Sequence, residues 1–337
     1  MTAAGYRAVV RALLVVNPVA TGATPGRRDV AVQVLSTTCK LEVVETTARG
    51  DAERLAREAA DDGLDAVLAL GGDGTLNEVV TGVLHRGPGP GLPAVGVLPA
   101  GSANVVARTL GAPRDVAAAA HRLAGLLAAG RRRGVDLGRA TGLEGGPRWV
   151  VFSAGVGVDA DVVAAVEAAR AEGRPATWQR YVALALREYL AGGRPGRHAT
   201  ASLRLRVHGS GRRAAPGVPP PDGRVHEVAQ VLVTNSDPWT YTGSTAVRPT
   251  PRASLGGGLD VLAARTLAPG VVARTVVEML LPGGRGPRSP QVVRGHDLDL
   301  VEVTAACEVR AQVDGDSAGR TRALAVERVR RAVDLVA

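Results

Sequence analysis

The sequence is poor in cysteine, aromatic residues and lysine, and each shortage argues against a class of protein. The two cysteines, Cys39 and Cys307, are too few for a disulfide framework, and neither stands in a metal-ligand spacing. Three tryptophans, four tyrosines and one phenylalanine provide few side chains on which nucleic-acid bases can stack. Lys40 is the only lysine, so the net charge of +9 comes from arginines spread along the chain. We therefore expect no nucleic-acid partner.

Long apolar runs are also missing. No stretch approaches the roughly 18 uncharged apolar residues of a membrane-spanning helix. The apolar run over 8–18 is interrupted by Arg11 and ended by Asn17 and Pro18, which favours a first strand over a signal peptide. We expect a cytoplasmic protein that makes peripheral contact with the inner face of the membrane, where positive charge favours anionic lipids.

The first 135 residues alternate the patterns of strands and helices. Apolar runs predict strands over 8–18, 40–47, 65–70 and 93–102. Helical periodicity lies between them, as over 51–63 and 115–130. This alternation predicts an α/β nucleotide-binding domain over residues 1–135, with an open parallel sheet covered by helices on both faces.

The pattern changes beyond residue 135. Apolar and polar residues alternate over 201–207 and 307–313, and further strands are predicted over 228–234 and 258–264. A few helices are expected among them, including one over 177–190. Residues 136–337 are therefore predicted to form an antiparallel β-sandwich domain with a few helices.

Three stretches follow strands of the predicted parallel sheet, at the edge where such sheets bind ligands. They are Asn17-Pro18, the glycine loop Gly71–Thr75, and Gly101-Ser102, where Ser102 is expected to cap the following helix. Glycines allow backbone amides to approach phosphate oxygens, and a helix N-terminus adds partial positive charge.

Asp73, inside the glycine loop, is unexpected in a phosphate site. A carboxylate repels phosphate unless Mg²⁺ lies between them or the carboxylate accepts a proton from an attacking hydroxyl. This combination points to phosphoryl transfer. The alternative is a plain glycine turn in which Asp73 caps a helix.

These motifs together resemble one family. "GGDGTLNEV" (71–79), preceded by "NPVATG" and "TTARGDA" and followed by "LPAGSANVVART", resembles the catalytic domain of the diacylglycerol kinase and sphingosine kinase superfamily of lipid kinases. Further along, "VDLGR", "SAGVGVDADVV", "RPTPRASLGGGLDV" and "AQVDGD" follow in the family's order. The resemblance implies an ATP- and Mg²⁺-dependent lipid kinase in which ATP and lipid meet in a cleft between a nucleotide lobe and a β-sandwich.

The resemblance also implies roles for single residues. Asp159 would lie near the lipid head group, and Asp316, preceded by Asp314, falls on the position of the proton acceptor; Asp73 is the alternative base. The expected nucleotide-binding residues are Asn17, Thr46, Gly71, Gly72, Asp73, Gly74, Thr75, Asn77, Glu78, Gly101 and Ser102.

Three positions depart from the family pattern. Asp316 replaces the usual glutamate and is one methylene shorter, and Val105 stands where many relatives have aspartate. Gly256 and Gly257 replace an acidic pair that holds a structural Mg²⁺ in some bacterial relatives. A metal in that loop, at Ser254, Gly257 and Leu259, would depend on backbone carbonyls, which suit a hard divalent ion poorly, so we expect Mg²⁺ only with ATP.

Two other functions remain open at this point. An NAD kinase-like enzyme would share the glycine turn, and the lost acidic residues are compatible with a catalytically silent nucleotide- or lipid-binding protein. The lipid itself, whether diacylglycerol, a sphingoid base, monoacylglycerol or a polyprenyl alcohol, is not determined by these motifs. The expected partner is a lipid substrate at the membrane surface, and a homodimer remains open.

Overall fold

The computed structural model describes residues 9–172, 178–192, 203–209 and 223–337. The chain forms two compact units, the first running to Val135 and including Arg331–Ala337, the second comprising Asp136–Arg330. The sequence analysis assigned all of 136–337 to the second domain. The last residues belong to the first unit instead, because Leu335 pairs with Val95 in its sheet.

The first unit is built on an open parallel sheet, as predicted. Its strands are β1 (Val10–Val16), β2 (Cys39–Glu45), β3 (Ala66–Gly71) and β4 (Ala94–Pro99). Their order is β4-β3-β1-β2, all parallel, and the end of β16 (Asp316–Leu335) lies beside β4. Strand β3 is buried along its whole length, as its continuously apolar sequence requires.

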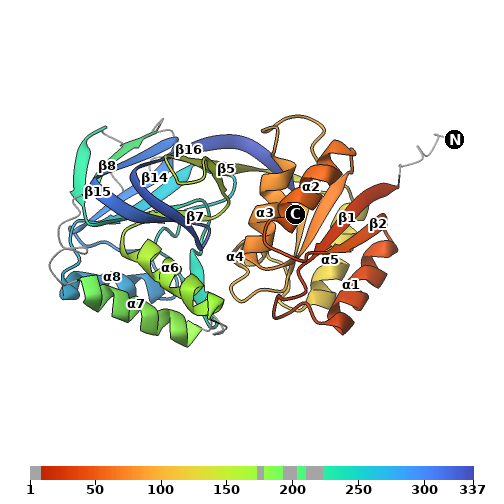
Figure 1. The fold of residues 1–337 in the computed structure, drawn as a ribbon, viewed down its shortest axis with the longest axis horizontal. Helices are drawn as coiled ribbons and strands as arrows, with labels where there is room; N and C mark the ends of the chain where they lie inside the picture. Colours follow the sequence, from red (N-terminus) through yellow and green to blue (C-terminus); the bar gives the residue numbers. More distant parts are fainter. Residues whose placement is uncertain (1–8, 173–177, 193–202, 210–222) are drawn as a thin grey trace. The chain divides into compact units, whose positions relative to one another are not determined.

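Helices cover both faces of this sheet. They are α1 (Pro25–Ser36), α2 (Asp51–Asp61), α3 (Asp73–Val83), α4 (Val105–Thr109) and α5 (Val116–Ala128). Helices α1 and α5 pack together on one face, and α2 and α3 pack together on the other (Figure 1). The neighbouring strands β1 and β3 therefore send their following helices to opposite faces. Such a switch point leaves a crevice at the carboxyl ends of the two strands.

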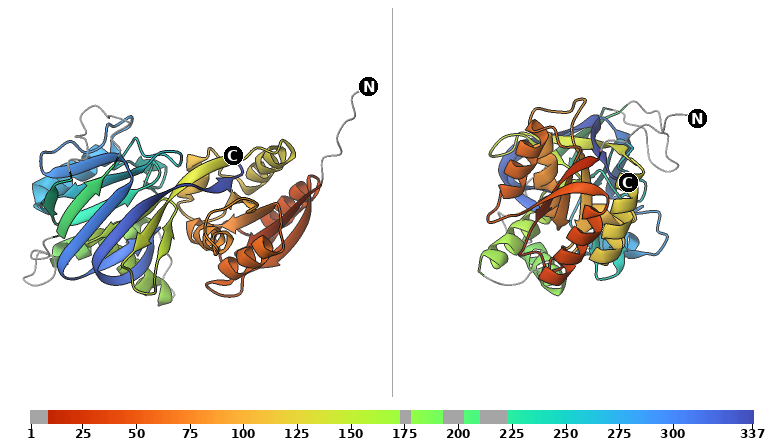
Figure 2. Two further views of the ribbon diagram at one scale, coloured as in Figure 1. Left: turned by 90° about the horizontal axis from the view of Figure 1, so that it is seen from above. Right: turned by 90° about the vertical axis from the view of Figure 1, so that its right-hand side faces the viewer.

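The second unit is rich in antiparallel strands, which confirms the predicted fold class. Its main strand order is β14-β13-β10-β7-β15-β16, and β8 branches from β15. Figure 2 shows the long strands β15 and β16 side by side. The strands are β5 (Arg133–Thr141), β6 (Arg148–Val150), β7 (Ser153–Val156), β8 (Leu203–His208), β9 (Val225–Val228), β10 (Gln230–Thr234), β11 (Thr240–Thr242), β12 (Thr245–Val247), β13 (Leu259–Ala264), β14 (Val292–Leu298), β15 (Leu300–Val313) and β16.

Buried residues of the second unit form a hydrophobic core, and strand β8 shows how the sequence builds it. Leu203, Leu205 and Val207 face this core while the arginines between them are exposed, as the alternation predicts. The alternation predicted over 307–313 is confirmed at Ala311 and Val313, which are buried, and is wrong at Cys307. Cys307 is exposed, because the pairing of β15 with β16 shifts register between Thr304 and Val309.

In the described part of the second unit, three helices accompany the strands: α6 (Val158–Ala171), α7 (Trp178–Gly192) and α8 (Pro269–Leu280). Helix α7 corresponds to the helix predicted over 177–190, whose first residue lies outside the described residues. Within the described part of the chain, no helix combines the length and apolar character needed to cross a bilayer.

Candidate active site

The crevice at the ends of β1 and β3 brings together two of the three predicted loops. Asn17 follows β1, and its backbone amide donates to the Leu70 carbonyl of β3 at 2.9 Å. Its side-chain Nδ2 donates to Thr75 Oγ1 at 3.0 Å. The side chain of Asn17 thus reaches the first turn of α3, although the two residues are far apart in the sequence.

Glycines are needed here because the loops touch through their backbones. A Cβ on Gly71 would lie 2.5 Å from Thr75 Oγ1, and one on Gly101 would lie 2.5 Å from the Gly72 Cα. The carbonyl of Gly71 in turn accepts from the Ala100 amide at 2.8 Å. The loops after β3 and β4 are therefore packed as one unit in which side chains have no room.

Gly74 differs from these glycines. A Cβ at this position would meet no atom within 4 Å, so Gly74 borders open space rather than a neighbouring loop. The first turn of α3 begins here, and its first helical bond runs from the Leu76 amide to the Gly72 carbonyl at 3.1 Å. The preceding amides of Asp73, Gly74 and Thr75 have no acceptor among the described residues. These donors, with the positive end of the helix, fit the phosphate oxygens of ATP.

Asp73 does not face this open space. Its Oδ2 accepts from the Val105 amide at 3.0 Å and its Oδ1 from the Val106 amide at 3.3 Å. The carboxylate thereby caps the short helix α4. Desolvation by the surrounding protein raises the pKa of the Asp73 carboxyl group. The hydrogen bonds from the amides of α4 act in the opposite direction and lower it.

The helix cap predicted at Ser102 is wrong. Helix α4 begins at Val105 and has Asn104 as its N-cap, without a side-chain capping bond. Asn104 lies in the left-handed region, with φ of 49°, and its amide group bonds both backbone groups of Gly101, at 2.8 and 2.7 Å. The analysis of the sequence gave Asn104 no role. Its signal was available, since asparagine tolerates this conformation better than most residues.

The remaining nucleotide-binding candidates lie around the same crevice but have local partners. The Thr46 amide, directly after β2, donates to the Val16 carbonyl at 2.8 Å. Glu78 Oε1 accepts from the Gly50 amide at 3.1 Å and so holds the start of α2. Asn77 Oδ1 lies 3.5 Å from Thr81 Oγ1 on α3.

In the second unit, the candidate carboxylates Asp314 and Asp316 lie in two different environments. Asp314 is buried, and its carboxylate accepts from the amides of Val151, Phe152 and Ser153 at 2.7, 2.8 and 2.8 Å. Asp316 is half-buried, directly after the two-residue turn between β15 and β16. The Asp314 carboxylate therefore holds the turn against the backbone of residues 151–153, and Asp316 carries the more accessible carboxylate of the turn.

Both turn residues have the backbone conformation of a tight hairpin. The φ angles of Asp314 and Gly315 are 51° and 78°, the combination for which Asp-Gly is preferred.

Asp159 is connected to this turn through a residue that the sequence analysis did not identify. It lies in the first turn of α6 and is buried. Gln312 Nε2 donates to Asp159 Oδ2 at 2.8 Å, and Gln312 Oε1 accepts from the Gly315 amide at 3.0 Å. A Cβ on Gly155 would lie 2.6 Å from Asp159 Oδ2, so β7 also leaves space for this contact. One buried amide therefore fixes the head-group candidate relative to the turn that carries Asp316.

The loop proposed for a structural metal is held by protein contacts. The Gly257 amide donates to the Ser254 carbonyl at 2.9 Å, and the Gly258 amide donates to Asp297 Oδ1 at 2.9 Å. Leu259 pairs with Leu298 in the sheet. Because one carbonyl is already used and no loop side chain offers a carboxylate, Ser254, Gly257 and Leu259 do not fit a hard divalent ion.

A buried cation stands close to this loop. Arg328 forms ion pairs with Asp136 at 2.7 Å, Asp297 at 3.2 Å and Asp299 at 3.5 Å. Its side chain is only 11% exposed, so the guanidinium pairs with the buried carboxylates of Asp136 and Asp297 away from water, whereas Asp299 is more exposed. Arg328 thus connects Asp297, which holds the Gly258 amide, with Asp136 of the "VDLGR" motif.

Comparison with known proteins identifies the segment that carries the glycine loop. Residues 11–140 match the family described as the diacylglycerol kinase catalytic domain. Over 98 residues the chain is 43% identical to the diacylglycerol kinase of Bacillus subtilis (strain 168). Over 75 residues it is 48% identical to a Chromohalobacter salexigens protein named "Probable lipid kinase YegS-like". The resemblance predicted from the motifs is confirmed for this segment.

These alignments are partial. They cover 29% and 22% of this chain, and 30% and 24% of the two relatives. The chain thus matches less than a third of the length of either relative.

Two crystal structures from Bacillus anthracis str. Sterne share the fold. One, of a diacylglycerol kinase, has a TM-score of 0.66 at 18% identity and covers 98% of this chain and 97% of that chain. The other has a TM-score of 0.71 at 19% identity, with 98% of each chain covered. At this identity the likeness establishes the fold alone.

Proposed function

We propose that this chain, whose residues 11–140 match the diacylglycerol kinase catalytic domain, transfers the γ-phosphoryl group of ATP to a lipid hydroxyl. The observation that supports this most is the set of unpaired amides of Asp73, Gly74 and Thr75 at the switch point of a parallel sheet. Open space adjoins them at Gly74. Three amides at a helix N-terminus suit a triphosphate better than a neutral ligand.

Mg²⁺ is assigned to the nucleotide in this proposal. No group of three or more His, Cys, Asp or Glu side chains within the described ranges has the arrangement of a metal site. The carboxylate of Asp73 is already held by the amides of α4. A magnesium ion carried by the triphosphate would neutralise the charge that develops on the transferred group.

Asp316 is the proton acceptor in this reaction. The lipid hydroxyl oxygen forms a bond to the γ-phosphorus, the bond from this phosphorus to the bridging oxygen breaks, and ADP leaves. The hydroxyl proton passes to the Asp316 carboxylate, which is more accessible than that of buried Asp314. Asp159 orients the lipid head group from the first turn of α6. Asp73 acts as a positioning residue that holds α4 against the glycine loop.

The direct test is incubation with labelled ATP and Mg²⁺ and a panel of lipids in mixed micelles, with mass spectrometry of the phosphorylated product. The panel contains diacylglycerol, monoacylglycerol, a sphingoid base and a polyprenyl alcohol, and NAD is included as a non-lipid acceptor. Labelled lipid supports the proposal. Labelled NAD alone would establish an NAD kinase, and ATP binding without any labelled product would establish a silent binding protein; either result refutes the proposal.

Two substitutions at Asp316 test its role. Asp316→Asn removes the proton acceptor, so kcat should fall by about 100-fold or more, the lower end of general-base contributions. Asp316→Glu keeps a carboxylate and should retain activity within about tenfold, the equivalent of 1.4 kcal/mol. Equal activity of Asp316→Asn and the wild type would remove Asp316 from the mechanism without affecting the assignment of the substrate.

A matched pair of glycine variants tests the position of the nucleotide. Gly74→Val and Gly125→Val each place a branched side chain where a Cβ meets no atom within 4 Å, so both should fold. Only Gly74 adjoins the unpaired amides. ATP affinity, measured by isothermal titration calorimetry, should be lost in Gly74→Val and retained in Gly125→Val. Retention in both would place the triphosphate elsewhere.

A further inference from the structure

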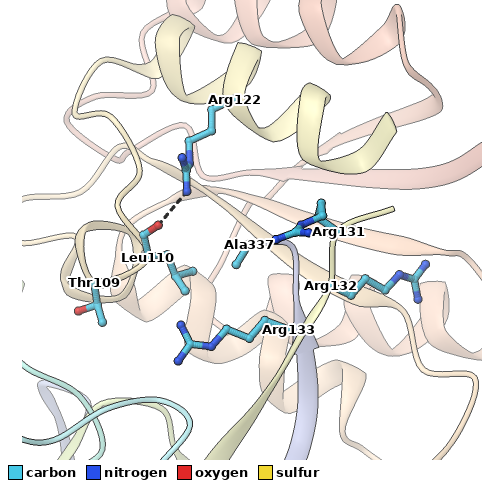
Figure 3. Close-up of a pocket in the computed structure, with 7 residues that line it drawn as sticks. All are labelled: Thr109, Leu110, Arg122, Arg131, Arg132, Arg133 and Ala337. Carbon is cyan, nitrogen blue, oxygen red and sulfur yellow. Dashed lines mark hydrogen bonds between the residues drawn. The ribbon is translucent and has the colours of Figure 1, made fainter. Parts of the chain in front are cut away.

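Four arginines surround a hollow in the first unit that is separate from the glycine loop. The hollow has a volume of about 460 Å³ and is lined by Thr109, Leu110, Arg122, Arg131, Arg132, Arg133 and Ala337 (Figure 3). This volume lies within the usual range for small-ligand sites, about 300–1,000 Å³. The arginines come from α5, from the connection after α5 and from the start of β5. Separate elements thus bring arginines to the rim of one hollow, although in Figure 3 the guanidinium group of Arg132 points away from that of Arg133.

These guanidinium groups lack acidic partners. No acidic side chain lines the hollow, although the α-carboxylate of Ala337 belongs to one of the lining residues, and none of the four arginines forms an ion pair within the described ranges. Arg122 donates to the Leu110 carbonyl at 3.1 Å, and Arg132 donates to the Asp65 carbonyl at 3.2 Å. Neutral carbonyls orient these two side chains but leave their charge uncompensated. Like charges held close together repel one another, and a bound anion would relieve this repulsion.

The hollow is not part of the nucleotide crevice. Arg132 is bonded to Asp65, which directly precedes β3, whereas the glycine loop begins at the other end of that strand. A strand of six residues spans about 20 Å, so Arg132 lies far from the glycine loop along the sheet. Thr109, at the end of α4, lies about one helical turn from Val105, whose amide Asp73 holds, so this side of the hollow is the one nearer the glycine loop. ATP bound on the glycine loop therefore does not account for Arg132.

We propose that this arginine hollow is a second anion site, which binds a phosphate group. Guanidinium groups match phosphate oxygens in planar, bidentate hydrogen bonds and prefer them to less charged acceptors. The guanidinium groups of Arg131 and Arg133, for which the described residues provide no hydrogen-bond acceptor, make the direct contacts. Arg122 and Arg132, oriented by carbonyls, add charge around them. The phosphate belongs either to a soluble anion or to the head group of an acidic lipid. The site is independent of the proposed kinase activity.

Arginine modification locates such binding within the chain. Phenylglyoxal reacts with free guanidinium groups, and its products can be assigned to single arginines by mass spectrometry. Inorganic phosphate, added at constant ionic strength, should slow modification of Arg131 and Arg133 about tenfold, as expected if a charge-assisted contact holds each group. Arg57, exposed on α2, should react at an unchanged rate. Equal effects of phosphate on all three arginines would refute the proposal for soluble phosphate.

Vesicles distinguish the two sources of phosphate. One preparation contains phosphatidylcholine alone and the other contains phosphatidylcholine with phosphatidate. Protection of Arg131 and Arg133 only by phosphatidate vesicles assigns the site to lipid phosphate, and protection by inorganic phosphate assigns it to a soluble anion. Equal protection by both vesicles indicates general coverage of this face. If both vesicle preparations protect equally and inorganic phosphate has no effect, the proposal is overturned. It is also overturned if no probe protects Arg131 and Arg133.

A pair of double variants separates the site from general charge. Arg131→Ala with Arg133→Ala, and Lys40→Ala with Arg57→Ala, each remove two positive charges from exposed positions of the first unit. The probe that protects in the modification experiment should bind the first variant about tenfold more weakly, by calorimetry or vesicle sedimentation. The second variant should bind it like the wild type. Equal weakening in both would mean that net charge alone attracts the anion.

Discussion

Asp73→Asn tests whether the aspartate of the glycine loop contributes through structure. In the wild type its two carboxylate oxygens accept from the Val105 and Val106 amides. Asparagine offers one acceptor oxygen and turns a donor toward the other amide, so one charge-assisted bond is lost. Such a bond contributes about 1.5–3 kcal/mol. Desolvation of the carboxylate, which raises the pKa of Asp73, offsets part of this loss when the charge is removed. We expect the free energy of unfolding of the first unit to fall by less than this amount.

The two units can be followed separately in one urea titration. All three tryptophans, Trp149, Trp178 and Trp239, lie in the second unit, so their fluorescence reports its unfolding. Far-UV circular dichroism reports both units. Asp73→Asn should shift a circular-dichroism transition to lower urea and leave the fluorescence transition in place.

Asp115→Asn is the matched control for this experiment. Asp115 caps α5 through one bond, from the Ala118 amide at 2.9 Å, and is exposed. Asparagine caps helices about as well as aspartate, so this variant should lose less than about 0.5 kcal/mol. If Asp73→Asn proved no less stable than Asp115→Asn, the capping of α4 by Asp73 would have no energetic weight. A large loss of turnover without loss of stability would return Asp73 to the chemistry.

Three further predictions concern the second unit. Gln312→Leu removes both side-chain bonds of this positioning residue, so kcat should fall about tenfold with the KM for ATP unchanged. Unaltered kinetics would refute the role. Arg328→Met leaves buried carboxylates without their cation, so the unit should lose about 3–5 kcal/mol of stability, measured by tryptophan fluorescence in urea; a loss below 1 kcal/mol would contradict this. The Asp260 carboxylate accepts a hydrogen bond from His296 and raises the pKa of this histidine above its ordinary 6.5. The pair therefore contributes its full stabilisation of the folded unit below pH 6.5. This stabilisation is lost as the pH rises through the raised pKa of His296. His296→Gln should flatten this fall in stability, and an unchanged pH profile would show that the pair does not contribute.

Local patterns were sufficient for the main elements of the first unit. Strand β3 could be predicted because six consecutive buried residues must all be apolar, and the glycines after it because a Cβ at Gly71 would meet the next helical turn. The Asp314-Gly315 turn was equally predictable, since this dipeptide favours the hairpin conformation that the structure adopts. Such features depend on neighbours in the sequence, and their physical causes act over a few residues.

Long-range partners were beyond such patterns. The strand order β4-β3-β1-β2 places Asn17 against Thr75, and no periodicity specifies which strands become neighbours. The same holds for Asp73, whose partners lie more than thirty residues away in α4, and for Gln312, whose sequence position indicates only a strand.

The sequence by itself thus determined which residues can approach a phosphate closely, because glycine content and apolar runs are local properties. Only the tertiary structure decided which carboxylates stay accessible. The carboxylates of Asp73 and Asp314 accept from backbone amides of distant segments, and Asp314 is buried as well, whereas Asp316 is half-buried directly after its turn. A carboxylate finds its hydrogen-bond donors only after the chain has folded, so its chemical role depends on contacts that no stretch of sequence contains.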